Sequence, residues 1–420
     1  MSEGQKKIVL IGAGKIGKGY VADLFEKAGY QLVLLTRSLR QAKALREQGY
    51  YTLFKYFDDE SEPVARKISD FEAYSTEEEY EASVAALVDA NYATLHLYPG
   101  AFEAVGKMIG DVIKERVRQG KKDTLDIMLL LNFVDPDAII REHIESRLET
   151  PEEWEDYNER IGLVKALTFR WGGNPRPFML EEDALCACAA DSPDIPVDAE
   201  AFKGEIPTDV PLRPLTKMRE RLAYKVWGGN VNHYILSVIG YVKGYTYTFE
   251  AEEDEYVVKC ATLGTQEARF GYDQVFTLTE AEKEENNRGR QRRGVRPQKR
   301  EEGAEKKAPV RYDEVTRVAA DPIRKLARND RLIGPALGCI KAGRVPYFLT
   351  LAAAYAFIYA PPEDQEAMEI QAYLAENSIE QAVEHFCQLD LTKPEENQIY
   401  QLVLTQYYNL VDIDPYEISY

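Results

Sequence analysis

The sequence predicts an α/β protein in which an N-terminal, doubly wound parallel sheet precedes a mostly α-helical C-terminal domain. Two observations support this fold class. In the first half, short apolar runs alternate with stretches of helical periodicity, which is typical of a parallel sheet covered by helices. In the second half, nearly every apolar segment has helical spacing. The 420 residues suffice for two or three compact units, and we expect domains at 1–205 and 206–420.

The expected elements follow in chain order. The first strand, 6–11, ends at Gly12, and helical spacing over 15–28 follows it, so the chain opens as strand, turn and helix. The other elements expected in the first half are strands at 31–35, 93–97 and 127–131 and a helix at 102–119. The helices expected in the second half are 217–244, 257–272, 322–327, 346–360, 364–376 and 379–389.

Charge and cysteine content limit the partners and the compartment. Fifty-two basic and 71 acidic residues give a net charge of −19, which disfavours nucleic acid and membranes as partners. The five cysteines are odd in number and unevenly spaced, so a disulfide framework is not expected. No secretory signal pattern opens the sequence. The apolar run 345–360 is too short to span a membrane comfortably, and we expect it to form a buried core helix. We therefore expect a cytoplasmic protein.

A segment of opposite charge lies at 283–311. It has eleven basic and five acidic side chains and few apolar ones, so it can bury little surface. We expect a mobile, solvated insertion without a partner there. A phosphate-rich partner is the alternative, although no nucleic-acid function is expected from this loop.

The turn after the first strand carries a glycine motif. Gly12 allows a tight turn, Gly14 lets a pyrophosphate approach the backbone, and Gly17 permits close packing of helix on strand. The following helix N-terminus offers N–H groups to the phosphates. This context predicts a Rossmann-type dinucleotide site. Its expected residues are Gly12, Ala13, Gly14, Lys15, Ile16 and Gly17.

The residue after the second strand discriminates between the nicotinamide cofactors, because a carboxylate there accepts from the ribose 2′-hydroxyl whereas a cation accommodates a 2′-phosphate. This chain has Arg37 between Thr36 and Ser38. Of the two nicotinamide cofactors covered by the term NAD(P), the pattern therefore favours NADP(H) over NAD(H). The alternative is that Arg37 stacks over the adenine or points into water.

Three polar residues in the second half share a helical spacing. Lys225, Asn230 and His233 fall at about 0°, 140° and 80° on an ideal α-helix, so one side would present a proton-transfer group and two hydrogen-bond donors. The alternative is a solvated lysine and a core histidine.

This pattern, Lys-x4-Asn-x2-His, resembles the catalytic signature of the polyol-specific long-chain dehydrogenase/reductase family, which includes mannitol dehydrogenases. The resemblance spans about 6–390 and also rests on the stretches 12–19, 202–204, 315–318, 321–326 and 329–335. It implies an NAD(P)-dependent oxidoreductase that interconverts a polyol with the corresponding ketose. The substrate would be either free or phosphorylated, as in the pair mannitol 1-phosphate and fructose 6-phosphate.

The resemblance also implies roles for the three residues. Lys225 would be the general acid/base, while Asn230 and His233 would stabilise the reacting oxygen. We expect no metal, because no histidine pair has metal-site spacing and Cys186 and Cys188 lack a second cysteine pair. Hydride transfer without a metal is therefore favoured.

Two family motifs are only partly kept. Of an Asp-Arg pair expected beside the substrate, Arg170 remains after Phe169, and of a Glu-Asn-Met run beside the nicotinamide, Asn132 remains. Asn132 would bond the cofactor, or it is only a residue of a turn at a strand end.

A phosphorylated substrate requires cations. The candidates in the most family-like stretch are Arg324, Lys325 and Arg331. The alternative is that they form structural ion pairs with Asp321 and Asp330.

Two other functions stay open at this point. One is a different keto-acid or keto-sugar reductase, because residues 34–37 also resemble the strand end of ketopantoate reductases. The other is a dinucleotide-sensing protein without catalysis. The sequence indicates no oligomeric state.

Overall fold

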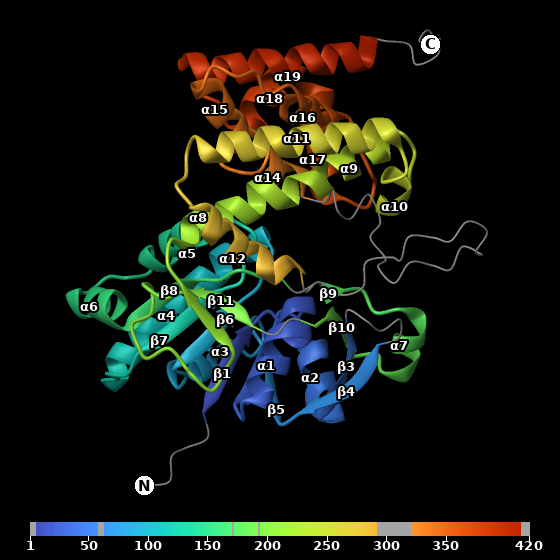
Figure 1. Ribbon diagram of the computed structural model, residues 1–420. Helices are drawn as coiled ribbons and strands as arrows, with labels where there is room; N and C mark the ends of the chain where they lie inside the picture. Colours follow the sequence, from blue (N-terminus) through green and yellow to red (C-terminus); the bar gives the residue numbers. More distant parts are fainter. Residues whose placement is uncertain (1–5, 58–62, 170–171, 192–193, 292–320, 413–420) are drawn as a thin grey trace. The chain divides into compact units, whose positions relative to one another are not determined.

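The computed structural model describes residues 6–57, 63–169, 172–191, 194–291 and 321–412. These residues form two compact units (Figure 1). The first extends through Arg219 and also takes in the chain from Glu284, and the second comprises Glu220–Lys283 and the described chain from Asp321.

A six-stranded parallel sheet forms the centre of the first unit, with the strand order β5-β2-β1-β6-β7-β8. The four predicted strands are present, which confirms the doubly wound sheet; β5 and β8 at its two edges were not predicted. The strands are β1 (Lys7–Ile11), β2 (Gln31–Thr36), β5 (Phe71–Ser75), β6 (Tyr92–Leu95), β7 (Leu125–Leu129) and β8 (Ile161–Lys165).

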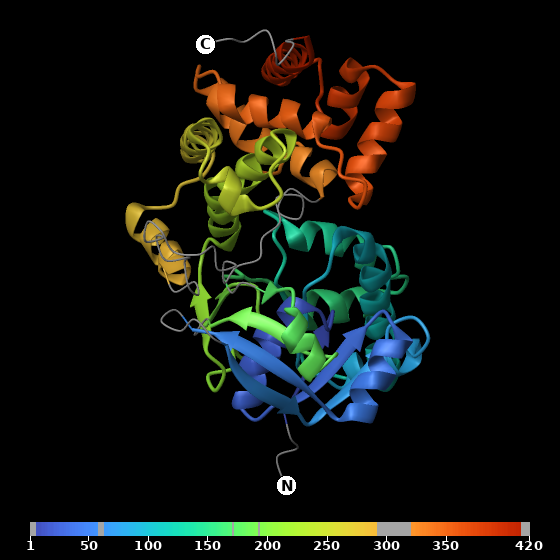
Figure 2. The same cartoon turned by 90° about the vertical axis from the view of Figure 1, so that its right-hand side faces the viewer.

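Alternate residues of β1 enter separate hydrophobic cores on the two faces of this sheet. Ile8 and Leu10 belong to one core, and Val9 and Ile11 to the other. The first core includes η1 (Gly17–Val21) and α1 (Ala22–Lys27), and the second includes α3, α4, α5 and α6. The latter four helices span Tyr80–Val88, Phe102–Gln119, Pro136–Glu145 and Pro151–Arg160. Helices therefore cover both faces, as the ribbons in Figures 1 and 2 show.

Further strands complete the first unit. A second sheet has the order β4-β3-β10-β9, and β11 pairs with β12. Because β12 lies beyond residue 205 and pairs with β11, the contacts assign the chain through Arg219 to the first unit. The remaining elements of this region are α2 (Leu39–Gln48), β3 (Tyr50–Tyr56), β4 (Val64–Ser69), β9 (Gly172–Gly173), α7 (Pro177–Glu182), β10 (Ala187–Ala190), β11 (Ile195–Asp198) and β12 (Leu212–Leu215).

The second unit is helical, as predicted, and has its own hydrophobic core. All six predicted helical stretches are present. Most of α16 is buried, so the predicted core helix is confirmed, and no helix in the described part of the chain is long and apolar enough to cross a bilayer. From residue 218 onward, the helices that the described residues form besides α12 are α8 (Met218–Lys225), η3 (Val226–Asn230), α9 (Val231–Val242), α10 (Thr248–Ala251), α11 (Glu255–Asp273), α14 (Pro322–Leu326), α15 (Ile333–Lys341), α16 (Tyr347–Ile358), α17 (Gln365–Glu376), α18 (Ile379–Cys387) and α19 (Pro394–Asp412).

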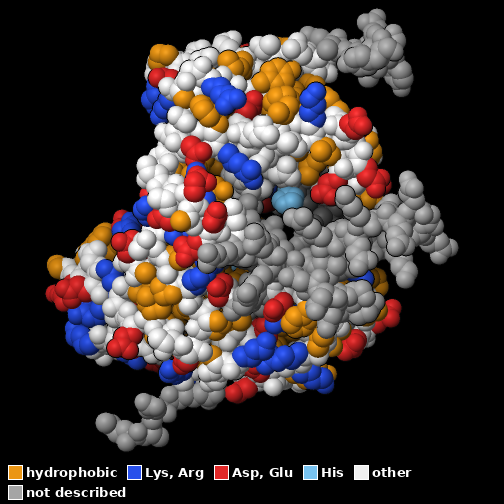
Figure 3. Space-filling view, in the orientation of Figure 1, with side chains coloured by type: hydrophobic (Ala, Val, Ile, Leu, Met, Phe, Trp, Pro, Cys, Tyr) orange, Lys and Arg blue, Asp and Glu red, His pale blue; other side chains and the backbone are white. Residues whose placement is uncertain are grey.

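The start of the expected basic insertion is helical, which corrects the prediction of a loop there. Residues Glu280–Gln291 form α12, and the remainder of 283–311 lies outside the described residues. Thr279 Oγ1 accepts from the N–H of Glu282 (3.3 Å), and Glu282 accepts from the N–H of Thr279 (2.7 Å). This reciprocal cap is a sequence signature of a helix start, and it could have identified α12. On the face in Figure 3, acidic and basic side chains are interspersed over the described residues.

The N-terminus of α16 is capped by a carboxylate from α11. Glu267 accepts hydrogen bonds from the backbone N–H groups of Phe348 (2.8 Å) and Leu349 (3.0 Å), two of the donors that a helix start leaves unpaired. Burial raises the pKa of Glu267 to about 7, although the two donors favour the charged form. The folded state therefore binds a proton at this site more tightly than the unfolded chain does.

This shift predicts a pH-dependent stability. Between the ordinary pKa of 4.5 and about 7, the folded protein holds more protons at Glu267 than the unfolded one, so the free energy of unfolding should fall as the pH rises through this window. We expect a loss of about 1–2 kcal/mol, allowing for partial exposure of the carboxyl. Glu267→Gln should flatten that part of the profile in urea unfolding followed by circular dichroism. Glu369→Gln, an exposed control on α17, should leave the profile as in the wild type; an unchanged slope in Glu267→Gln would contradict the assignment.

Candidate functional site

The glycine turn requires its first glycine for two reasons. Gly12 has φ = +103°, a conformation that L side chains rarely adopt. A Cβ built on it would lie 2.7 Å from the carbonyl oxygen of His96. The N–H groups of Gly12 and Ala13 donate to the carbonyl of Leu35 (3.0 and 2.9 Å), which ties the turn to the end of β2.

The other two glycines differ from each other in their surroundings. No atom lies within 4 Å of a Cβ built on Gly14, which is exposed, so a phosphate has room to approach the backbone there. A Cβ on Gly17 would lie 2.4 Å from the carbonyl oxygen of Gly12, so the helix packs tightly on the turn. Lys15 and Ile16, both half-buried, form the start of this helix. The geometry suits the roles predicted for the motif.

His96, for which no sequence pattern predicts a role, lies beneath this turn. It follows β6, and a Cβ on Gly17 would approach its ring to 2.5 Å. Its Nε2 is 3.1 Å from the hydroxyl of Thr94, and its buried Nδ1 has no hydrogen-bond partner among the described residues. Burial lowers the pKa of His96 to about 4, so the ring is neutral at physiological pH. Its position directly after a strand on the same sheet edge is the signal that could have identified it.

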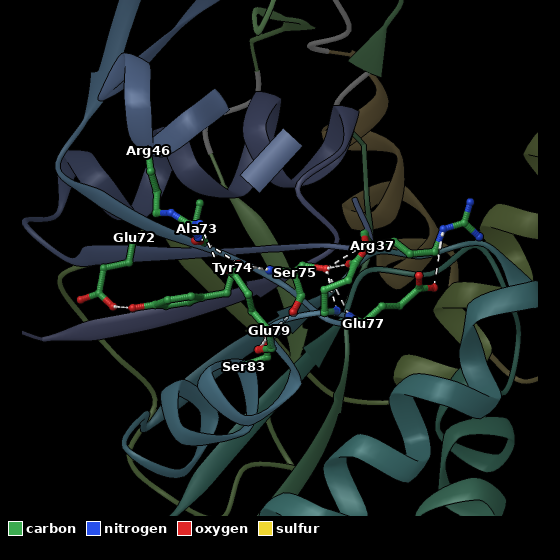
Figure 4. A network of polar contacts seen from close by, with 10 residues as sticks. Arg37, Arg46, Glu72, Ala73, Tyr74, Ser75, Glu77, Glu79 and Ser83 are labelled. Carbon is green, nitrogen blue, oxygen red and sulfur yellow. Dashed lines mark hydrogen bonds and ion pairs between the residues drawn. The ribbon is translucent and has the colours of Figure 1, made fainter. Parts of the chain in front are cut away.

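Arg37 follows β2, at the carboxyl-terminal ends of the parallel strands, where the glycine turn also lies. Its side chain is 85% exposed, and its Nε lies 4.0 Å from a carboxylate oxygen of Glu77 (Figure 4). The neighbouring hydroxyls have local roles: Thr36 donates to Gln41 (2.7 Å), and Ser38 caps α2 by accepting from the N–H of Gln41 (3.3 Å). The guanidinium is therefore the group at this position that is open to a ligand.

Asn132 is exposed and lies three residues beyond Leu129, the last residue of β7. β1, β2 and β7 are parallel strands of one sheet. Gly12, Arg37 and Asn132 therefore all lie where the carboxyl ends of these strands meet. Ligands of doubly wound sheets bind at this edge. Arg170 lies outside the described residues, and Phe169 before it is buried.

The helix with the Lys-Asn-His pattern is not a regular α-helix, which corrects the angular prediction. Lys225 ends α8, residues 226–230 form the π-helical turn η3, and His233 lies in α9. In a π-turn, residues five apart are hydrogen-bonded neighbours, so Asn230 follows Lys225 on nearly the same side, closer than the predicted 140°. Lys225 is 3% exposed, and Asn230 and His233 are half-buried.

The family-like stretch 329–335 packs against this helix. The indole N–H of Trp227 donates to the carbonyl of Asn329 (3.2 Å). A Cβ on Gly334 would lie 2.5 Å from the ring of Trp227. The hydroxyl of Ser237 donates to the carbonyl of His233 (2.7 Å). These contacts hold the irregular helix in place, which gives the stretch a structural role.

The cations of the same stretch are buried beside α9. The Lys325 ammonium lies 5.1 Å from the ring centre of Tyr234, the neighbour of His233, and is 4% exposed. Burial, with the charges of Arg331 and Arg324 nearby, holds the pKa of Lys325 well below its usual range. Arg324, Lys325 and Arg331 define the cation cluster. Its Lys325 contacts Tyr234, whose sequence neighbour His233 is a candidate catalytic residue.

Ion pairs satisfy only part of the cation cluster. Arg331 pairs with Asp330 (2.7 Å), and Arg324 pairs with Asp321 (3.3 Å), as the structural alternative predicted. However, Nη2 of Arg331 is buried and has no hydrogen-bond partner among the described residues, and the same holds for the hydroxyl of Tyr234. Such groups are costly to leave unpaired, so they are suited to an anionic ligand.

No group of three or more metal-ligating side chains occurs among the residues that the structure describes. The five cysteines are buried free thiols, and burial raises the pKa of Cys188 and Cys339 to about 12.

Comparisons with known proteins bear on this arrangement. Residues 6–168 match the family model of the mannitol dehydrogenase Rossmann domain. A mannitol-1-phosphate 5-dehydrogenase of Brevibacillus brevis is 25% identical over 88% of this chain and 90% of its own length. One of Bacillus pumilus is 27% identical over 95% of this chain and 99% of its own.

A solved structure shares the fold of the whole chain. The mannitol 2-dehydrogenase of Pseudomonas fluorescens, in a ternary complex with NAD and D-mannitol, superposes with a TM-score of 0.74 at 14% identity, over 98% of this chain and 93% of its own. The predicted fold class is therefore confirmed. The predicted resemblance to polyol-specific dehydrogenases is confirmed over most of the chain.

Proposed function

We propose that this protein is an NAD(P)-dependent oxidoreductase that interconverts a polyol phosphate, of the mannitol 1-phosphate type, with the corresponding ketose phosphate, of the fructose 6-phosphate type. One observation carries the proposal: a buried lysine, an asparagine and a histidine share one irregular helix, and buried cations pack against that helix through Tyr234. The similarity to relatives named mannitol-1-phosphate 5-dehydrogenase supports the substrate class.

The residues of the helix suit alcohol oxidation. A bound nicotinamide supplies or accepts the hydride at the reacting carbon. Lys225, shielded from water, takes the proton of the substrate hydroxyl as the C–H bond breaks and returns it in the reverse direction. Asn230 and His233 hydrogen-bond the same oxygen and stabilise its developing negative charge. The scheme needs no metal ion.

The cation cluster suits the phosphate. Arg331 keeps a buried N–H group available after pairing with Asp330, and Lys325 adds a second donor beside it. Bidentate arginine contacts are well matched to phosphate oxygens. In a protein of net charge −19, such local cations are needed to attract an anionic substrate.

The dinucleotide binds at the glycine turn in this proposal, with its pyrophosphate against Gly12, Ala13 and Gly14 and the start of the helix at Lys15. The exposed guanidinium of Arg37 favours NADP(H) over NAD(H), because it can pair with a 2′-phosphate. Asn132 follows a strand end on the same side of the sheet and would bond the nicotinamide ribose or carboxamide.

A panel of ketose phosphates, free ketoses and 2-keto acids, assayed with NADPH and NADH, tests the proposal. We expect reduction of ketose phosphates, followed by the loss of reduced-nicotinamide absorbance, with a higher kcat/KM for NADPH. Turnover of keto acids alone would instead indicate a reductase of the ketopantoate type. Dinucleotide binding without turnover of any compound would indicate a sensing protein.

A further inference from the structure

Two loops meet at the end of the sheet where the proposed dinucleotide would bind with its adenosine ribose. β5 pairs in parallel with β2, with Ser75 opposite Thr36, so the chain following each strand emerges at the same edge. The N–H of Thr76 donates to the carbonyl of Thr36 (2.9 Å), and the hydroxyl of Ser75 donates to the carbonyl of Arg37 (3.0 Å). The loop after β5 is therefore held against Arg37.

Three consecutive glutamates follow in this loop, and their side chains have different partners. Glu79 accepts from the N–H of Ser75 (2.9 Å) and forms a two-point ion pair with Arg46 (2.8 and 3.0 Å). Glu78 is hydrogen-bonded to the hydroxyl of Ser75. Glu77 instead faces Arg37, and Figure 4 shows these two side chains extending together beyond the network around Ser75.

We propose that Glu77 is a specificity-determining residue of the dinucleotide site, which opposes Arg37 and limits the preference for NADP(H). The inference rests on the proposed dinucleotide function. Its carboxylate is 4.0 Å from the Arg37 guanidinium and 62% exposed, so a 2′-phosphate held by Arg37 would meet a second negative charge within a few ångströms. The 2′-hydroxyl of NAD(H) carries no charge and can donate to a carboxylate.

The opposition is electrostatic, which sets its size and its salt dependence. Both side chains are largely exposed, so screening by water and ions keeps the effect moderate. We expect Glu77→Gln to tighten NADPH binding about threefold to tenfold at low ionic strength and to change NADH binding less than about twofold. The gain should shrink as salt is added.

Equilibrium binding of NADPH and NADH without substrate, followed by nucleotide fluorescence, tests this inference separately from catalysis. The variants are Glu77→Gln, Arg37→Gln and the control Glu81→Gln, an exposed glutamate in the first turn of α3. Arg37→Gln should weaken NADPH about tenfold, and Glu81→Gln should leave both affinities nearly unchanged.

Each outcome decides the inference. An NADPH-to-NADH affinity ratio that rises in Glu77→Gln but not in Glu81→Gln supports it. An unchanged ratio, an equal shift in both variants, or weaker NADPH binding in Glu77→Gln overturns it, the last because Glu77 would then position Arg37 for the phosphate. Binding with this shift but without turnover of any polyol or ketose would remove the proposed catalytic function and leave the inference standing, whereas failure of the wild type to bind either nucleotide would remove both.

Discussion

Lys225→Ala is expected to lower kcat about a thousandfold while the affinity for the dinucleotide stays nearly unchanged. The side chain is 3% exposed and lies at the junction of α8 and the π-turn, where it is shielded from water. Losing it removes the proposed proton acceptor and leaves the glycine turn in the first unit intact. Stopped-flow turnover and fluorescence titration of the nucleotide, measured on the same preparation, separate the two effects.

Two further variants guard this experiment against a folding defect. Lys225→Met keeps most of the buried volume and should be as inactive as Lys225→Ala, and Lys259→Ala, an exposed lysine of α11, should have wild-type activity. A small primary amine added to Lys225→Ala should restore part of the rate if the lost group transfers a proton. Retained turnover in both Lys225 variants would remove this residue from the mechanism.

Arg331→Met is expected to raise the KM for a ketose phosphate about a hundredfold and to change the KM for the free ketose little. Arg331 is 5% exposed, and its Nη2 has no hydrogen-bond partner among the described residues, so a phosphate oxygen would complete its hydrogen bonding. Steady-state kinetics with the phosphorylated and free sugar give the discrimination directly. Arg344→Met, an exposed arginine of the same unit, is the matched control.

Asp330, the ion-pair partner of Arg331, also affects the outcome of this experiment. Removing Arg331 alone leaves Asp330 buried and unpaired, which could cost several kcal/mol of stability. The double variant Asp330→Asn with Arg331→Met removes both charges and should fold while keeping the high KM for the phosphate. Equal losses for phosphorylated and free sugar in the folded double variant would show that the cation cluster is structural only.

Local patterns in the sequence were sufficient for much of the fold. The β-branched run before Gly12, the glycine motif and the helical spacing of the second half depend on neighbours along the chain, and they predicted the central strands and six helical stretches. The strands β4 and β9 escaped prediction because their sequences, VARKIS and GG, carry no apolar alternation. β4 pairs with β3 and β9 pairs with β10, and this sheet is completed because β3 and β10, from distant parts of the chain, pair with each other.

The irregular helix shows the limit of periodicity. A π-turn adds one residue to a helical turn. The 3.6-residue spacing of apolar residues over 217–244 predicts a regular α-helix and cannot reveal this extra residue. In the structure, Trp227 packs against Gly334 and bonds Asn329, about a hundred residues away, so the packing of this turn depends on distant residues. The sequence showed which residue types occupy positions 225, 230 and 233, but it could not predict how their side chains are oriented relative to one another.

Local patterns of residue types were enough to predict the glycine turn and the helix of the candidate site. Gly12 needs its residue type for a positive φ, and the spacing of Lys225, Asn230 and His233 identified the helix and its resemblance. Which polar groups are buried, paired or left with an unsatisfied donor became visible only in the folded protein: His96 lies beneath the turn, Glu77 faces Arg37, and Arg331 has one nitrogen without a partner among the described residues. The reason is that burial and electrostatic pairing depend on groups brought together by folding, whereas backbone conformation and local periodicity depend on the nearest residues.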